Sequence, residues 1–341
     1  MQNKSSFRKL RLSLSVGLLL GAFLFILPLF AISGKKGEPP VLPPTPSLPV
    51  SAAPTSAPVR ADEGQTLRVL TEGGRVEEMT LADYLWRVVA AEMPAGFEPE
   101  ALKAQAVCAR TYTLWKLAAG SHGETADICA DSSCCQAYTD PARAAEKWGE
   151  QHGEFSAKIA RAVENTDGMV LTYGGEPIQA VFFSSSTYTT EDAAAVWGSS
   201  LPYLVSVESP EGDEVPNYRS TVTLTAEQMR ALAASAGATL SGKATGWISG
   251  VSYTASGRVA SLKFGDVTLS GGGARTLFGL RSACFTVREA DGVFTFSVTG
   301  YGHGVGMSQY GANAMAAAGS TWQDIVTHYY TGIDIESVTS T

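Results

Sequence analysis

Residues 98–118 read EPEALKAQAVCARTYTLWKLA, and this stretch sets the architecture of the chain. Small and apolar residues recur in it at helical spacing, with Ala101, Ala104, Val107 and Cys108 on one face. Pro99 is suited to the first turn of a helix, because proline has no backbone N–H to leave unpaired there. The stretch therefore predicts a long helix that packs at the centre of a core.

Further helices and strands are expected on both sides of this helix. Hydrophobic periodicity and turn residues delimit them. The expected helices are 81–92, 153–165, 226–236, 307–318 and 321–329, and the expected strands are 66–70, 169–173, 179–183, 248–253, 258–263, 286–288 and 294–298. This mixture predicts the α+β class, with largely antiparallel strands in a two-lobed exported domain that follows one transmembrane helix.

Charge is distributed very unevenly along the 341 residues. Seven of the 25 basic residues but only one of the 33 acidic residues lie in residues 1–61, so the remainder carries 18 bases against 32 acids, a net charge of −14. So acidic a surface repels phosphate backbones, which excludes nucleic-acid binding as a main function.

An apolar run occupies residues 12–33, LSLSVGLLLGAFLFILPLFAIS, without a charged residue. Twenty-two residues at helical rise can span a bilayer, and the basic residues of the tail at 1–11 favour a cytoplasmic N-terminus. The alternative is a signal peptide cleaved near Ala31. Both interpretations place the remaining chain outside the cytoplasm.

The segment at 34–63 contains eight of the 16 prolines, between Pro39 and Pro58. Such a composition predicts a semi-extended linker, which leaves 64–341 as the exported domain.

Glu92 ends an apolar helix in the sequence Ala90-Ala91-Glu92-Met93-Pro94. Desolvation disfavours the charged carboxylate, so this residue could act as a general acid; the alternative is a glutamate that faces solvent. Lys103 and Arg110 lie two helical turns apart and share a face, either as cations near Glu92 or as solvated charges.

A cysteine-rich loop, SHGETADICADSSCCQAY, contains His122, Cys129, Cys134 and Cys135. Three thiols and an imidazole can hold zinc tetrahedrally, although an exported protein can form a disulfide instead. With all four ligands used, the zinc would be structural. Cys108 and Cys284 are expected to be buried and unreactive.

A glycine-rich segment, GYGHGVGMSQYGA at 300–312, allows close approach of its backbone to a ligand, or serves only as a turn into the next helix. It lacks the Lys-Ser/Thr pair of a phosphate-binding loop. His303 and Ser308 suggest a base and a nucleophile, with no third member nearby. The polar run SSSTYTTED at 184–192 either lines a sugar cleft or is solvated.

Three stretches together resemble the stage II sporulation protein D family of peptidoglycan lytic transglycosylases. They are AAEMPAGFEPEALKAQAVCARTY, AVFFSSSTYTTEDAAAVWGSSLPYLVSVESPEG and GYGHGVGMSQYGANAMAAAG followed by WQDIVTHYYTGIDI, and together they span most of residues 66–336.

The resemblance implies that Glu92 is the catalytic acid and base, and that the groove takes glycan strands stripped of stem peptides. It implies zinc held by His122, Cys129, Cys134 and Cys135, with Cys134 where a second histidine is usual. The implied substrate-binding residues are Lys103, Arg110, Ser184, Ser185, Tyr203, His303, Ser308 and Gln309. Phe183 stands where family members often have histidine, and Val205 where they often have a basic residue.

The resemblance also implies a role in engulfment during sporulation, at the mother-cell membrane facing the forespore. The implied partners are the stage II sporulation proteins P, an amidase, and M. Two rival functions remain open: a non-catalytic glycan-binding scaffold or amidase enhancer, and a zinc hydrolase that uses the loop metal.

Overall fold

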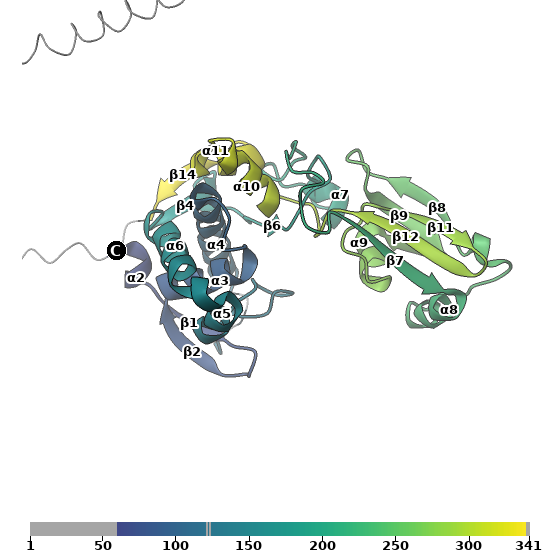
Figure 1. The fold of residues 1–341 in the computed structure, drawn as a ribbon, viewed down its shortest axis with the longest axis horizontal. Coiled ribbons are helices and arrows are strands. Elements are labelled where there is room, and N and C mark those ends of the chain that lie inside the picture. Colours follow the sequence, from purple (N-terminus) through teal and green to yellow (C-terminus); the bar gives the residue numbers. More distant parts are fainter. Residues whose placement is uncertain (1–59, 121, 123, 339–341) are drawn as a thin grey trace, which may run out of the picture. The chain divides into compact units, whose positions relative to one another are not determined.

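The computed structural model of the chain describes residues 60–120, 122 and 124–338. The expected membrane anchor at 12–33 and the proline-rich segment up to residue 59 lie outside these residues. Among the helices that are described, none is both long enough and apolar enough to cross a bilayer. The described part is a mixed α+β structure with mostly antiparallel strand pairs, as predicted (Figure 1).

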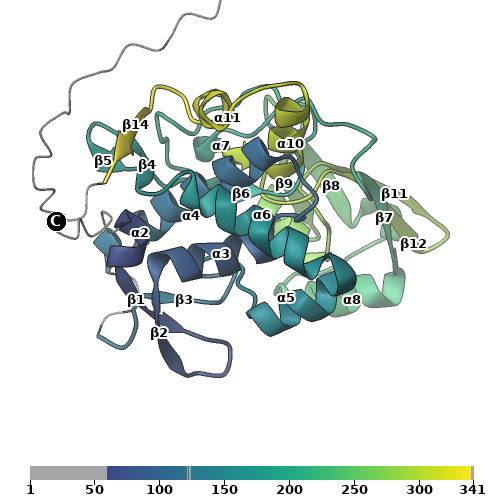
Figure 2. The same ribbon diagram turned by 60° about the vertical axis from the view of Figure 1, so that its left-hand side comes forward.

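The first lobe is built around the long helix α4, Pro99–Ala119. Helices from both ends of the chain pack against α4, and Figure 2 shows it enclosed by them. These helices are α3 (Leu81–Glu92), α6 (His152–Glu164), α10 (Gln309–Ala317) and α11 (Trp322–Tyr329). The face of α4 with Ala101, Ala104, Val107 and Cys108 is fully buried, which confirms the central position predicted from its sequence.

Short sheets complete this lobe. β1 (Thr66–Leu70) pairs with β2 (Val76–Thr80) in antiparallel orientation and with β3 (Ile128–Cys129) in parallel. A second sheet has the order β14-β4-β5, formed by Asp334–Ser337, Met169–Tyr173 and Glu176–Pro177. The parallel pairing matters for the site, because it fixes Cys129, in the middle of the cysteine-rich loop, beside Leu70.

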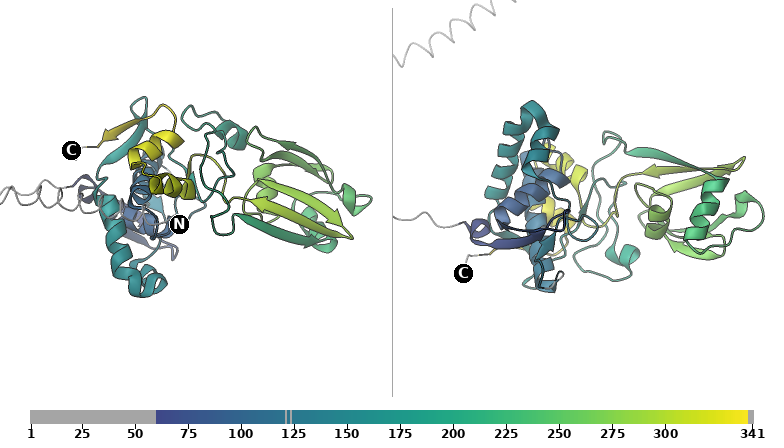
Figure 3. Two further views of the ribbon diagram at one scale, coloured as in Figure 1. Left: turned by 45° about the horizontal axis from the view of Figure 1, so that its top comes forward. Right: turned by 90° about the horizontal axis from the view of Figure 1, so that it is seen from below.

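The second lobe has its own core of aromatic side chains, among them Phe264, Phe278, Phe294 and Phe296. Two three-stranded antiparallel sheets enclose this core, with α8 (Ala226–Ser235) and α9 (Gly271–Leu277) beside them; Figure 3 shows their strands in green. The first sheet contains β7 (Arg219–Thr225), β11 (Phe285–Ala290) and β12 (Val293–Thr299), and the second contains β8 (Ile248–Tyr253), β9 (Val259–Phe264) and β10 (Val267–Ser270).

Two expectations differ from the observed elements. The strand expected at 179–183 is limited to β6 (Phe182–Phe183), because Ala180 and Val181 make short-range backbone bonds, such as the one from Val181 N to Gln179 O at 2.8 Å. The helix expected at 307–318 begins only at Gln309, since Met307–Ser308 form β13, which pairs in parallel with β6. The backbone of these two strands brings the glycine-rich segment against 182–183.

Four short helices were also absent from the sequence expectations, namely α2 (Ala61–Gly64), α5 (Pro141–Trp148), α7 (Ala193–Trp197) and α9. α2 begins within the segment expected as linker, and its Asp62 is buried against α4. The folded part therefore includes residues 61–63.

Candidate functional site

Glu92 is the last residue of α3. Met93 leaves the helix in an extended conformation and Pro94 follows, so the helix ends with the carboxylate at its tip. Glu92 Oε1 accepts a hydrogen bond of 2.7 Å from the backbone N–H of Ala137. Burial raises the pKa of Glu92, and the bonds from Ala137 and from the Gln309 amide offset part of that rise.

A cavity of about 700 Å³ opens over Glu92. Its walls come from the tip of α3, the cysteine-rich loop, the segment around β6, Trp197 and the glycine-rich segment. Besides Glu92, the lining includes Tyr112, Cys134, Cys135, Gln179, Ser184, Trp197, Tyr301, His303 and Gln309. Glu92 is the only carboxylate among the lining residues of the described chain, so a mechanism that needs two carboxylates has no second one there.

The glycine-rich segment forms another part of the cavity wall. Gly302 has a φ of 117°, and a Cβ on it would lie 2.6 Å from the Cβ of Phe183. Gly306 has a φ of 75°, and its Cβ would lie 2.1 Å from the carbonyl oxygen of Val181. Only glycine allows this close approach, which places His303 between these two positions and beside the cavity.

His303 is held in a single tautomer. Its Nδ1 accepts a hydrogen bond of 3.1 Å from Val305 N–H, so Nε2 carries the proton and donates to Phe182 O at 3.0 Å. Burial lowers the pKa of His303 to about 4, and the nearby guanidinium groups of Arg275 and Arg258 contribute. The ring is therefore neutral at physiological pH, and both nitrogens are occupied.

Ser308 does not pair with His303. Its hydroxyl donates to the buried carboxylate of Glu211 and accepts from Gly311 N–H at the start of α10. Ser308 is thus a buried capping residue, and the base–nucleophile pair suggested by the sequence does not form.

Gln309 reaches the cavity from the first turn of α10. Its Nε2 donates to Oε1 of the fully buried Gln105 at 3.3 Å, and the same amide lowers the pKa of Glu92. Sequence reasoning did not single out Gln105, although a long polar side chain on an apolar helix face was an available signal. Tyr112, Gln179, Trp197 and Tyr301 were missed as well.

The other predicted sugar-binding residues differ in position. Ser184 lines the cavity. Ser185 is buried, and its backbone exchanges two hydrogen bonds with that of Tyr301, at 3.0 and 2.9 Å. Tyr203 lies behind the wall, where its hydroxyl accepts from Gln179 N–H at 3.2 Å.

The structure does not bring Lys103 and Arg110 to the cavity. Lys103 pairs with Glu100 at 2.6 Å on its own helix. Arg110 is fully buried, and its Nε donates to Asp62 Oδ1 at 2.8 Å. Their shared face points toward these partners, so any role of the two residues in substrate binding would be indirect.

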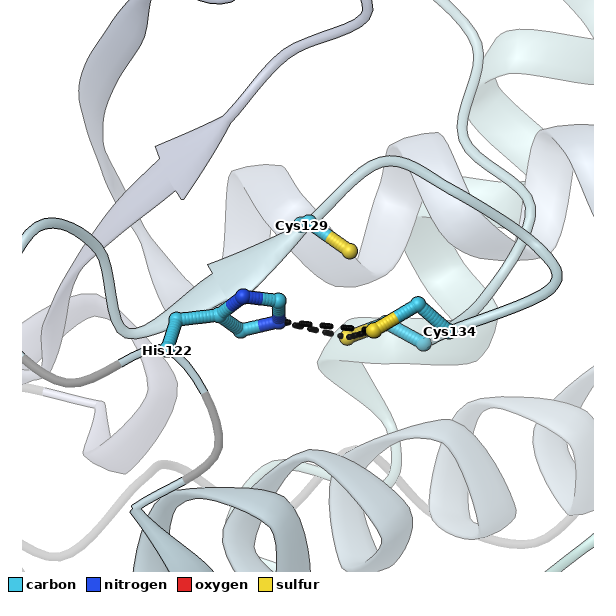
Figure 4. A group of neighbouring side chains, drawn as sticks. His122, Cys129 and Cys134 are labelled. Carbon is cyan, nitrogen blue, oxygen red and sulfur yellow. Dashed lines mark hydrogen bonds between the residues drawn. The ribbon is translucent and has the colours of Figure 1, made fainter.

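The cysteine-rich loop gathers four possible metal ligands at the edge of the cavity. The ligand atoms of His122, Cys129, Cys134 and Cys135 all lie within 4.8 Å of one another, and Figure 4 shows the imidazole directed toward the thiols. His122 Nε2 lies 3.2 Å from Cys135 Sγ and 3.7 Å from Cys134 Sγ. All five cysteines are free thiols, and a set of three sulfurs and one nitrogen at these separations suits a tetrahedral metal such as zinc.

The possible metal site and Glu92 are linked through the backbone. Cys135 precedes Ala137 by two residues, and the N–H of Ala137 bonds to the Glu92 carboxylate. Whatever fixes the loop therefore also positions a donor on the acid.

Comparison with known proteins identifies one family model and several similar proteins. The family model described as Stage II sporulation protein matches residues 71–173. Stage II sporulation protein D of Bacillus subtilis (strain 168) is 40% identical over 84% of this chain and 80% of its own length. Its counterpart in Bacillus amyloliquefaciens is also 40% identical, over 79% and 78%. The amidase enhancer of Bacillus subtilis (strain 168) is 31% identical over 73% of this chain and 40% of its own.

Proposed function

This chain belongs to the stage II sporulation protein D family, and from that premise we propose that it is a peptidoglycan lytic transglycosylase with Glu92 as its acid and base. The observation that supports the proposal most strongly is the cavity of about 700 Å³ with a single carboxylate in its lining. Burial keeps the proton on that carboxylate to a higher pH than usual, as a general acid requires.

A single acid fits this reaction better than ordinary glycoside hydrolysis. A hydrolase needs a second carboxylate to attack the sugar or activate water. In the proposed reaction Glu92 protonates the glycosidic oxygen as the bond from muramic acid C1 breaks. The 6-hydroxyl of the same muramic acid then bonds to C1 and returns its proton to Glu92, which leaves a 1,6-anhydro end and regenerates the acid. Tyr301 and Trp197, each about two-fifths exposed, provide ring faces for sugars along the cavity.

The substrate in this proposal is a glycan strand without stem peptides, cleaved during engulfment at the mother-cell membrane facing the forespore. The anchor at 12–33 would hold the enzyme at that membrane. Stage II sporulation proteins P and M are the proposed partners, with P, an amidase, supplying stripped strands.

The loop ligands would hold a structural zinc. The ion would hold the cysteine-rich loop in place, while all four protein ligands would fill its tetrahedral shell. This arrangement disfavours a zinc hydrolase, which keeps one position open for water.

Mass spectrometry of the products tests the proposal. Full-length protein incubated with stripped strands should release fragments with 1,6-anhydro-muramic acid ends. Glu92→Gln should lower the rate by about 10²- to 10⁴-fold, whereas Glu146→Gln, at an exposed site on α5, should not change it. Full activity of Glu92→Gln, or products with reducing ends, would refute the mechanism.

A second candidate function is supported by the 31% identity to an amidase enhancer. A glycan-binding enhancer of that kind would bind strands and stimulate an amidase without cleaving glycan, and Glu92→Gln would retain this effect. The same product assay, with an amidase added, separates the two functions.

A further inference from the structure

Two arginines of the second lobe lie beside the cavity without an acidic partner. Arg275, in the last turn of α9, lines a small cavity of about 50 Å³ that shares Gly302 and His303 with the large one. The guanidinium of Arg281 stacks 4.0 Å from the centre of the Tyr301 ring, and the backbone carbonyl of Arg281 accepts from Gly302 N–H. Within residues 60–120, 122 and 124–338, neither side chain forms an ion pair.

Both cations are half-buried rather than freely solvated. The Nε of Arg281 is buried, and no partner for it exists among the described residues. Burial lowers the pKa of Arg275, and the charge of Arg275 is felt at His303, whose pKa it helps to lower. Arg258, also in the small cavity, differs from these two because it bonds to the buried Glu191 at 3.3 Å.

Half-buried guanidinium groups without a counter-charge are costly unless they bind something. Residues 62–341 carry a net charge of −14, so the surface of this part of the chain as a whole repels anions. A local positive site in an acidic domain attracts an anionic ligand that the remaining surface repels. Guanidinium is also the group best matched to a carboxylate, since it can donate two parallel hydrogen bonds.

We propose that Arg275, in the small cavity beside His303, and Arg281, stacked on Tyr301, form a subsite for the free lactyl carboxylate of a muramic acid residue. This proposal rests on the proposed function and specifies its substrate. A muramic acid without a stem peptide carries this carboxylate, whereas a muramic acid with a peptide carries an uncharged amide at the same atom. The subsite would therefore distinguish stripped strands from intact ones.

A binding experiment in the Glu92→Gln background tests the subsite, because the strands then stay intact. Full-length protein in detergent is titrated with stripped strands, and with the same strands after carbodiimide coupling has converted their carboxylates to methylamides. We expect about tenfold tighter binding of the charged strands. The difference in affinity between charged and amidated strands should become smaller as the salt concentration is raised, since salt screens partly exposed charges.

Arginine variants test which side chains cause the preference for charged strands. Arg275→Gln and Arg281→Gln should each reduce the preference for charged strands several-fold, without changing the affinity for amidated strands. Arg288→Gln, at an exposed position on β11, is the matched control and should keep the full preference. Arg281→Lys, which keeps the charge but loses the planar fork, should keep part of it. Thermal unfolding of each variant establishes that it is folded.

Equal affinity for charged and amidated strands would overturn the subsite. An undiminished preference in both glutamine variants, or its loss in Arg288→Gln, would overturn it as well. A protein that prefers charged strands but forms no anhydro product would refute the transglycosylase and leave the subsite standing, whereas an active enzyme without the preference would refute the subsite alone.

Discussion

At the scale of single residues, the environment of Glu92 combines opposing effects. Burial favours the protonated form, while the N–H of Ala137 and the amide of Gln309 favour the carboxylate. In the proposed reaction Glu92 first gives and then takes a proton, and its surroundings support both steps, because burial stabilises the acid and the two donors stabilise the carboxylate.

The raised pKa of Glu92 predicts how stability depends on pH. Its native pKa lies above the unfolded value, so its contribution to stability is full below the unfolded pKa and is lost as pH rises through the native pKa. Glu92→Gln, which never ionises, should therefore melt at a higher temperature than the parent at pH 7. This gain in melting temperature should disappear near pH 4, because Glu92 is then protonated in the folded parent as well. Melting curves across this range measure it, and a variant less stable than the parent at pH 7 would contradict the prediction.

Residue patterns predicted part of the site. Glu92 was identifiable because an acid interrupts an apolar helix end, and the four loop ligands because thiols and imidazole cluster in the sequence. Tyr301 and Trp197 were not identifiable, since α7 and the glycine-rich segment meet only through tertiary folding. Helical spacing correctly gave Lys103 and Arg110 a common face. It could not show that Asp62, which lies 48 positions before Arg110, packs against that arginine.

At the scale of elements, α2 is attached to α4 by the buried pair of Asp62 and Arg110. Asp167 also accepts hydrogen bonds from the backbone of Ala61 and Asp62, each at 2.9 Å. Three consecutive glycines begin α9, which explains why sequence patterns did not predict a helix there; the Ser270 hydroxyl caps it by accepting from Gly273 N–H.

The two ion pairs of α4 offer a matched comparison. Asp62→Ala should destabilise the fold by about 3–5 kcal/mol, because it leaves Arg110 buried without a partner. Lys103→Ala should cost about 1 kcal/mol or less, because its ion pair with Glu100 is partly exposed, and this change keeps the bond from Trp322 N–H to Glu100. Urea unfolding of both variants measures the difference. Similar losses would show that burial does not decide the strength of these pairs.

The cysteine-rich loop should bind one metal ion per chain. Full-length protein purified with zinc should contain about one equivalent, and Cys129→Ser should lose most of it because one of four ligands is gone. Cys284→Ser, remote from the cluster, is the control. Metal analysis gives the content, and the melting temperature should fall with metal loss. Retention of the metal by Cys129→Ser would argue against this ligand set.

At the scale of the whole molecule, the two lobes differ in how readily sequence predicted them. Period and turn signals located β8, β9, β11 and β12 of the second lobe, which pair with neighbours in sequence. They did not locate β7, which pairs with the distant β12. In the first lobe, α10 and α11 come from the other end of the chain and pack against the helices near its beginning. No local sequence pattern predicts packing between segments so far apart in the sequence.

The apolar run at 12–33 predicts the behaviour of the full chain. The protein should sediment with membranes and require detergent for release, because 22 apolar residues can span the hydrocarbon core. Replacement of Leu18, Leu19 and Leu20 with aspartate should abolish membrane association. Recovery of the unaltered protein in the supernatant after salt or carbonate washing would instead indicate a cleaved signal peptide.

The cavity wall joins residues 92, 134–137 and 301–309, so its assembly depends on contacts such as that between Gln105 and Gln309, 204 positions apart. Contacts so far apart in sequence slow folding, because closing the intervening chain costs entropy before they can form. If the chain crosses a membrane with its N-terminal part leading, as proposed, Glu92 reaches the far side well before Gln309 does. Under the proposed function, glycan cleavage would begin only after the chain up to Gln309 has crossed the membrane and completed the cavity.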